Sequence, residues 1–376
     1  MNTRPSIESP NTTVVLSVAF NDDCSCFSVG LNTGYYVFNA AQCTLKCVRE
    51  FNGGIGLVQM LGKSNFVALV GGGKHPKFAQ NKVILWDDAK AKQSLEITAF
   101  TSVRNVQLAK NRIVVVLQNS VRVYAFAKPV NLIAAYETAD NLLGLCSLSD
   151  KTIAFPGRTT GQVQLVDIAT GNVSIIPAHS AALRALRFSP DGELLATASE
   201  QGTLIRVFAT SNCARIAELR RGIDQATIFS LAFSPSGTLL ASTSDKSTLH
   251  IFDVPHPKKS AREQPRANSV PEDGKGKWGV LGKIPLMPRV FSDVYSWASV
   301  PFEAGDEPLV GGLDVAAGAT LGTSRPQKGV VGWVEEDSLV VIGAGRDARW
   351  ERFVLGVTDD GVRVCQRQGW KRYIAS

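Results

Sequence analysis

The stretch Ala182–Ser199 reads ALRALRFSPDGELLATAS, and the stretch Thr227–Ser244 reads TIFSLAFSPSGTLLASTS. Their Ser-Pro pairs, which begin at Ser189 and Ser234, lie 45 residues apart. A self-match at a period of about 40–45 residues is typical of β-propeller blades, each of which is a small antiparallel sheet. The repeat therefore predicts that the chain is built from such blades.

The length of the chain sets the number of blades. At roughly 45 residues per blade, 376 residues allow seven blades and one long insertion. Short β-rich runs separated by turn residues recur along the chain, which favours an all-β protein. We therefore predict a single domain over residues 1–376, an all-β, seven-bladed β-propeller with WD40-like blades. Blade seven, between residues 329 and 364, has the weakest pattern.

One segment interrupts the blade pattern, and we predict it to be a long loop inserted in blade six at residues 253–293. Residues 254–291 carry eight Lys or Arg and three acids, a net charge of +5 out of +7 for the whole chain. Basic residues mixed with aromatic and aliphatic ones suit the interface of an anionic membrane. The alternative is a loop whose apolar end folds back on the propeller. The residues predicted to insert into a membrane are Trp278, Val280, Leu281, Ile284, Leu286, Met287 and Phe291.

The sequence contains no catalytic or metal-binding motif. The four histidines and the dispersed acids match no known catalytic pattern, so we expect no enzyme, no cofactor and no metal. No run of about 18 apolar residues could span a membrane. The seven cysteines lack zinc spacing and are odd in number, which favours reduced thiols in the cytoplasm. A nucleic-acid binder is disfavoured because the basic charge gathers in one loop without an aromatic-studded groove.

Two adjacent arginines, in Leu219-Arg-Arg-Gly222, lie between the two repeats. Side chains alternate across a strand, so one arginine can serve each flank. Guanidinium, imidazole and hydroxyl groups all donate to phosphate oxygens, which predicts two neighbouring anion sites. The alternative is a structural network that ties neighbouring strands. The first site is predicted to contain His179, Ser199, Thr203, Arg206 and Arg220, and the second Arg221, Thr227, Ser244, Lys246, Thr248 and His250.

These residues resemble the PROPPIN family, the phosphoinositide-binding propellers of autophagy and endosomes. Leu219-Arg-Arg-Gly222, after the strand-like run Gly202–Phe208, matches the Phe/Leu-Arg-Arg-Gly hallmark of that family. The form with Leu resembles the branch called WIPI-three/four-like or Hsv-like. The resemblance covers residues 12–304 well and blade seven poorly. Further matching pieces are Phe155-Pro-Gly157, Gln164–Asp167, Asn141–Cys146, Asn111–Leu117 and Phe20-Asn21.

The resemblance implies a function for each of these features. It implies binding of phosphatidylinositol 3-phosphate and phosphatidylinositol 3,5-bisphosphate, with Arg220 in one site and Arg221 in the other. It makes the blade-six insertion a loop that dips into the bilayer. It implies a cytoplasmic protein, peripheral on autophagosomal precursor, endosomal and vacuolar membranes. Asn21 and Asp23 match a position that recruits a lipid-transfer partner of autophagy, although a polar turn is an alternative interpretation. The competing function is a propeller scaffold that binds proteins only.

Overall fold

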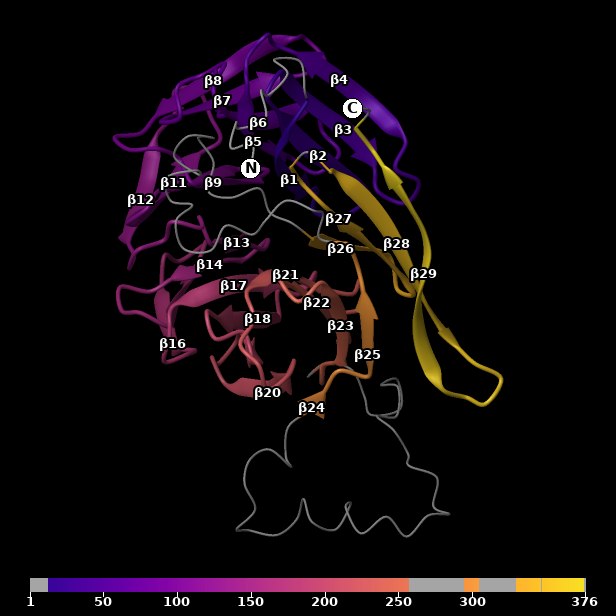
Figure 1. The fold of residues 1–376 in the computed structure, drawn as a ribbon. Helices are drawn as coiled ribbons and strands as arrows, with labels where there is room; N and C mark the ends of the chain where they lie inside the picture. The colour runs from indigo at the N-terminus through magenta and orange to yellow at the C-terminus, as the bar shows by residue number, and fades with distance from the viewer. Residues whose placement is uncertain (1–12, 257–293, 304–328, 346, 375–376) are drawn as a thin grey trace, which may run out of the picture.

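The protein forms a ring of seven β-sheets, each sheet being one blade whose first four strands are antiparallel (Figure 1). The computed structural model describes residues 13–256, 294–303, 329–345 and 347–374. Within these ranges the chain contains strands and no helix, so no helix in the described part is suited to crossing a membrane. The prediction of an all-β, seven-bladed propeller is therefore confirmed.

The blades follow one another along the chain, and in each blade the first strand lies innermost, where it contacts the first strand of the next blade. The first three blades consist of β1 (Val15–Phe20), β2 (Cys26–Leu31), β3 (Gly34–Asn39) and β4 (Leu45–Glu50); β5 (Ile55–Met60), β6 (Phe66–Gly71), β7 (Lys82–Asp87) and β8 (Lys92–Thr98); and β9 (Asn105–Ala109), β10 (Arg112–Val116), β11 (Ser120–Ala125) and β12 (Leu132–Glu137).

The other four blades follow the same order, with one additional short strand. They consist of β13 (Ser147–Leu148), β14 (Thr152–Pro156), β15 (Gln162–Asp167) and β16 (Val173–Pro177); β17 (Leu183–Phe188), β18 (Leu194–Ser199), β19 (Leu204–Ala209) and β20 (Arg215–Arg220); β21 (Ile228–Phe233), β22 (Leu239–Ser244), β23 (Thr248–Asp253) and β25 (Ala298–Pro301); and β26 (Val330–Glu335), β27 (Ser338–Ile342), β28 (Arg349–Val357) and β29 (Arg363–Arg372). The additional strand, β24 (Val294–Tyr295), lies outside β20.

The core lies between the blades. The second strands are buried along their whole length in blades one, five and six, because a neighbouring blade covers each face. The outer strands alternate between exposed and part-buried residues, as expected for a sheet edge that faces water. Residues of blades five and six, including Leu219 and Phe252, form one continuous apolar cluster. The region of the two arginines is therefore built on a rigid, shared core.

The ring closes between blades seven and one without a shared strand in the described residues. Val15 forms an isolated bridge with Gly345, and the indole Nε1 of Trp350 donates to Ala40 O at 2.7 Å. Phe27 and Tyr373 also meet edge to face. Blade seven extends beyond its predicted end at residue 364, because β28 and β29 are nine and ten residues long and β29 ends at Arg372. β29 is the largely exposed edge strand, and an exposed edge has a weak hydrophobic pattern, which explains the underestimate.

Blade six is completed by a strand that the sequence pattern did not reveal. β25 pairs with β23, and β24 pairs with β20 in parallel, with Arg220 opposite Tyr295. Both strands follow the predicted insertion, so the insertion separates the third and fourth strands of blade six along the chain. Residues 257–293, which include all seven residues predicted to insert into a membrane, lie outside the described residues.

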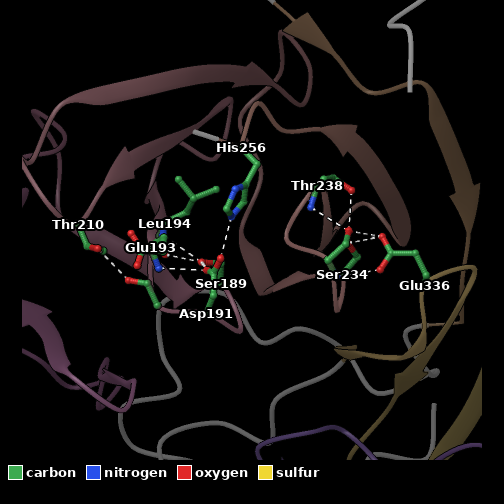
Figure 2. A network of polar contacts seen from close by, with 11 residues as sticks. Ser189, Asp191, Glu193, Leu194, Thr210, Ser234, Thr238, His256 and Glu336 are labelled. Atoms are coloured by element: carbon green, nitrogen blue, oxygen red, sulfur yellow. Dashed lines mark hydrogen bonds and ion pairs between the residues drawn. The ribbon is translucent and has the colours of Figure 1, made fainter. Parts of the chain in front are cut away.

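The repeated Ser-Pro turns join the first two strands of blades five and six. Gly192 and Gly237 have φ angles of 71° and 73°, a left-handed conformation that favours glycine. The hydroxyl of Ser189 accepts from the amide of Leu194 at 2.9 Å and donates to Asp191 at 2.6 Å. Asp191 also contacts Nε2 of the buried His256 at 2.8 Å (Figure 2). The turn of blade five thus supplies its own carboxylate, which also holds His256 near the start of the insertion.

In blade six the carboxylate that contacts the equivalent turn comes from blade seven. Ser236 stands 45 residues after Asp191 and carries no charge. Glu336, in the turn between β26 and β27, accepts from the hydroxyl of Ser234 at 2.9 Å and from the amide of Ser236 at 2.8 Å (Figure 2). The Ser236 hydroxyl also contacts Glu336. This contact joins blades six and seven at one edge of the ring.

Candidate anion-binding rim of blades five and six

The candidate residues gather at one rim of the ring, where the second strand of each blade turns into the third. The third residue of the third strand is Arg206 in blade five and His250 in blade six. Arg206 lies opposite Thr197 and His250 opposite Ser242, and these two partners are 45 residues apart. Arg206 and His250 therefore occupy equivalent places in the two repeats.

Residues that follow the outer strands complete these two places. The amide of His179, after β16, donates to Gly161 O at 2.9 Å, and the amide of Arg221, after β20, donates to Thr203 O at 3.0 Å. His179 Nε2 lies 3.0 Å from the hydroxyl of Thr197, in the next blade. One place thus combines His179 with Arg206, and the other combines Arg221 with His250. Each place is an arginine-histidine pair between two blades. In the first pair the histidine follows the outer strand and the arginine lies on the third strand of the next blade. In the second pair the arginine follows the outer strand and the histidine lies on the third strand.

The first place, between blades four and five, holds Arg206 in a fixed orientation. Its Nε lies 2.7 Å from a carboxylate oxygen of Glu218, and its Nη1 donates to Ala178 O at 2.7 Å. Burial, followed by the positive charge of Arg206, lowers the pKa of His179 to about 4. The imidazole is therefore neutral at pH 7 and is held beside a permanent cation.

The second place, between blades five and six, is more enclosed. Arg221 is 8% exposed; its Nε donates to Gly202 O at 2.9 Å and its Nη2 to Asp224 O at 2.6 Å. Burial, followed by the charge of Arg221, lowers the pKa of His250 to about 4. His250 contacts the hydroxyls of Ser296 at 3.0 Å and Thr248 at 3.1 Å. A buried cation and a neutral imidazole here favour an anion that can accept from both.

The remaining predicted residues surround these pairs at different depths. Ser244 is fully buried, and its hydroxyl has no hydrogen-bond partner within the described part of the chain. Ser199 is also buried, whereas Lys246 is exposed in the turn before β23. Thr203 and Thr227 are part-exposed, and the amide of Thr227 donates to Asp245 at 2.9 Å. Arg220 is part-exposed at the end of β20, on the strand that β24 joins.

Sequence reasoning missed three hydroxyl residues of this rim. Thr197 and Ser242 lie two residues before Ser199 and Ser244 in the buried second strands, and so share their face of the sheet. That spacing could have identified them. Ser296 follows the insertion, and its contact with His250 joins residues 46 apart along the chain. No local pattern marks such a residue.

The two residues predicted to bind a partner lie in the turn between β1 and β2. Asn21 is 1% exposed; its side chain accepts from the amide of Cys26 at 3.0 Å and donates to Ser25 at 3.1 Å. Asp23 is exposed and forms an ion pair of 2.7 Å with Lys63, from the adjacent blade. Asn21 therefore shapes the turn, and only Asp23 presents its side chain on the surface.

The comparisons with known proteins bear directly on this arrangement. The sequence profile of the PROPPIN family matches residues 14–289, a range that contains the repeat, the two arginines and both arginine-histidine pairs. The chain belongs to the PROPPIN family. Proteins called SVP1-like protein 2 are similar over nearly their full length: 48% identity in Neurospora crassa, covering 99% of each chain, and 57% in Emericella nidulans, covering 84% of this chain and 99% of the relative.

Solved structures agree on the fold of this PROPPIN. The crystal structure of Hsv2 from Kluyvelomyces marxianus superposes with a TM-score of 0.74 at 21% identity, covering 97% of this chain and 100% of that one. Proteins of the PROPPIN family are non-enzymatic β-propellers that bind phosphoinositide membranes and act in autophagy. The expectation of a binding protein rather than an enzyme thus agrees with the family.

Proposed function

We propose that this PROPPIN is a peripheral membrane adaptor that binds phosphatidylinositol 3-phosphate and phosphatidylinositol 3,5-bisphosphate at two sites on the rim of blades four to six. The observation that carries the proposal is the pair of equivalent arginine-histidine places between successive blades. Phosphate oxygens accept bidentate hydrogen bonds from guanidinium groups, and the buried guanidinium of Arg221 is held by backbone carbonyls of Gly202 and Asp224, which do not neutralise its charge. Arg206 and Arg220 belong to the first site, and Arg221 and His250 to the second.

The test replaces both arginines of the hallmark. Since one charge-assisted hydrogen bond contributes about 1.5–3 kcal/mol, loss of both sites in Arg220→Thr/Arg221→Thr should abolish flotation with vesicles that contain phosphatidylinositol 3-phosphate. A matched control, Lys110→Thr/Arg112→Thr, removes the same charge from the end of blade three that lies away from the rim. Unchanged flotation of a folded hallmark variant would contradict the two sites and favour a scaffold that binds proteins only.

The insertion is proposed to supply a second, apolar signal for membrane binding. Two head-group contacts give modest affinity, and stable anchoring usually needs a further hydrophobic element. Deleting residues 275–291 should therefore reduce flotation while leaving calorimetric binding of the soluble head group intact. Equal flotation of the deletion variant and the wild type would make the insertion a passive linker.

We further propose that blades one to three recruit a protein of the autophagy machinery, with Asp23 in the contact, on autophagosomal precursor, endosomal or vacuolar membranes. A similar fold, with a TM-score of 0.65 at 19% identity, is described as a complex of KlAtg21 with the coiled-coil of AgAtg16. For this chain the proposed partner is a lipid-transfer protein. Asp23→Lys should lower co-purification of that partner, whereas Asn21 is unsuitable for the test because its side chain shapes the turn.

A further inference from the structure

A cavity of about 340 Å³ lies between blades two and three, on the same rim of the ring but away from blades five and six. Its lining includes two arginines, Arg104 and Arg122, and the hydroxyls of Thr101, Ser102 and Ser120. No Asp or Glu side chain lines it. Blade four separates this cavity from blades five and six along the ring (Figure 1). The cavity shares no residue with the two proposed head-group sites, so it is independent of them.

Arg122 occupies the same place in blade three as Arg206 in blade five and His250 in blade six. All three are the third residue of the third strand of their blade. Only these three blades carry a basic or imidazole side chain at that place. In chain order the seven blades have Tyr36, Ile84, Arg122, Gln164, Arg206, His250 and Glu351 there. The position that carries the arginine-histidine pairs of blades five and six thus recurs as a cation in blade three.

The surroundings of Arg122 also correspond to those of Arg206. Arg206 reaches the end of the preceding blade, where it donates to Ala178 O beside His179. Arg122 likewise reaches the end of blade two, where its guanidinium lies 5.3 Å from the ring centre of Phe100. Phe100 is 88% exposed although it is a large apolar residue. An exposed aromatic ring beside a cation at the mouth of a cavity is suited to covering a ligand.

The two arginines differ from Arg206 at Nε, which in Arg206 contacts the carboxylate of Glu218. The Nε atoms of Arg104 and Arg122 are buried, and within the described part of the chain neither has a hydrogen-bond partner. Arg104 donates through Nη2 to Gln118, at a long 3.3 Å. Buried donors without acceptors are rare, because burying them costs the hydrogen bonds that they make to water. Two such donors in one cavity indicate that an acceptor group belongs there.

We propose that this cavity binds a phosphate group, carried either by a small soluble phosphate ester or by a lipid head group. A tetrahedral phosphate offers several acceptor oxygens, which two guanidiniums and neighbouring hydroxyls can share. The cavity volume lies at the lower end of the range for small-molecule sites, which suits a compact group better than an extended segment. Arg122 and Arg104 neutralise the charge, and Thr101, Ser102 and Ser120 donate to the remaining oxygens.

The experiment is calorimetry with inorganic phosphate and inositol 1,3-bisphosphate on the full chain carrying Arg220→Thr/Arg221→Thr, which silences the two rim sites. This variant should retain one binding event, and adding Arg122→Gln should weaken that event at least about tenfold. Arg122→Lys should retain part of the affinity. Arg112→Gln, on the same blade but at its other end, should have no effect.

Two further arms identify the source of the phosphate and keep the test decisive. In the otherwise wild-type chain, Arg122→Gln should lower the number of bound inositol 1,3-bisphosphates by one, which does not depend on how the hallmark variant folds. Flotation with phosphatidylinositol 3-phosphate vesicles assigns the site to lipid if Arg122→Gln weakens it, and to a soluble ester if it does not. Phosphate binding that is insensitive to Arg122→Gln would overturn the proposal. So would a site that binds a poly-glutamate peptide but neither phosphate probe.

Discussion

Blades five and six carry the same repeat and complete it in different ways. The first four strands of blade five come from consecutive residues, and its turn uses its own carboxylate, Asp191. Blade six takes its turn carboxylate, Glu336, from blade seven and its outer strand, β25, from beyond the insertion (Figure 2). Two similar sequences thus form one blade whose four main strands are consecutive and one whose turn and outer strand depend on distant segments. The repeat specifies the inner hairpin of a blade, and the remainder is set by what packs against it.

The largest expected effect is on the free energy of unfolding, and it concerns the turns that lead into the third strands of blades five and six. Gly202 and Ser247 both adopt positive φ, at 62° and 54°. A Cβ on Gly202 would come within 1.7 Å of Ala226 O, a backbone atom. Gly202→Ala should therefore lower the free energy of unfolding by about 2–4 kcal/mol, from left-handed strain and overpacking. Ser247→Gly, which removes strain, should change it by less than about 1 kcal/mol. Chemical denaturation measures both, and similar losses for the two variants would contradict this difference.

The next largest effect is the loss of stability at low pH that His179 and His250 should cause. In the unfolded chain each imidazole has its ordinary pKa of 6.5, and in the fold the pKa of His179 and of His250 is about 4. The fold disfavours the added proton, so this stabilisation is complete above pH 6.5 and is lost as the pH falls from 6.5 towards 4. At pH 5 the loss should be about 1–2 kcal/mol for each histidine.

Urea unfolding at pH 7 and at pH 5 measures this loss. The variant His179→Gln/His250→Gln should lose less stability between the two values than the wild type. His75→Gln is the matched control, because His75 is exposed. The single variants show whether blades five and six contribute equally. An identical loss in the wild type and in the double variant would rule out these two groups as the source.

The smallest expected effect concerns Glu336, the carboxylate of blade seven that contacts the turn of blade six. Glu336→Ala removes the acceptor of the Ser234 hydroxyl and the Ser236 amide, and should destabilise the fold by about 1–2 kcal/mol, since the site is partly open to solvent. Asp191→Ala should have a similar effect in blade five. Glu335→Ala, the neighbouring exposed residue, serves as control in thermal unfolding. If Glu336→Ala behaves like this control, blade six does not depend on blade seven for its turn.

The inner parts of the blades could be predicted from the sequence because their signals are local. Alternating apolar residues and Gly-containing turns identified the strands around Ser189 and Ser234, and blade count followed from the period. Glu336, β25 and the contacts that close the ring could not be predicted, because each joins segments about 50 or more residues apart along the chain. Pattern reasoning shows that a strand is buried, but not which distant segment covers it.

The same holds for the candidate site. The two arginines were identifiable from their position between the repeats, and His179, Arg206 and His250 from the types of group that bind phosphate. Thr197 and Ser242 were missed, although their spacing of two residues from Ser199 and Ser244 places them on the same face of their strands. Arg104 and Arg122 gave no signal at all, because their relation to Arg206 emerges only when the blades are superimposed by strand position.

The seam between blades seven and one has a consequence for the order in which the chain can fold as it is synthesised. The apolar cluster of blade one, with Val15, Phe27 and Phe38, is sealed by Trp350 and Tyr373, more than 300 residues later. Domains emerging from the ribosome generally fold from the N-terminus onward, at about 5–20 residues per second. One side of the core of blade one therefore stays uncovered until Trp350 and Tyr373 have been synthesised, which takes roughly the time needed to translate the rest of the chain. The blade that is synthesised first is the last to be finished.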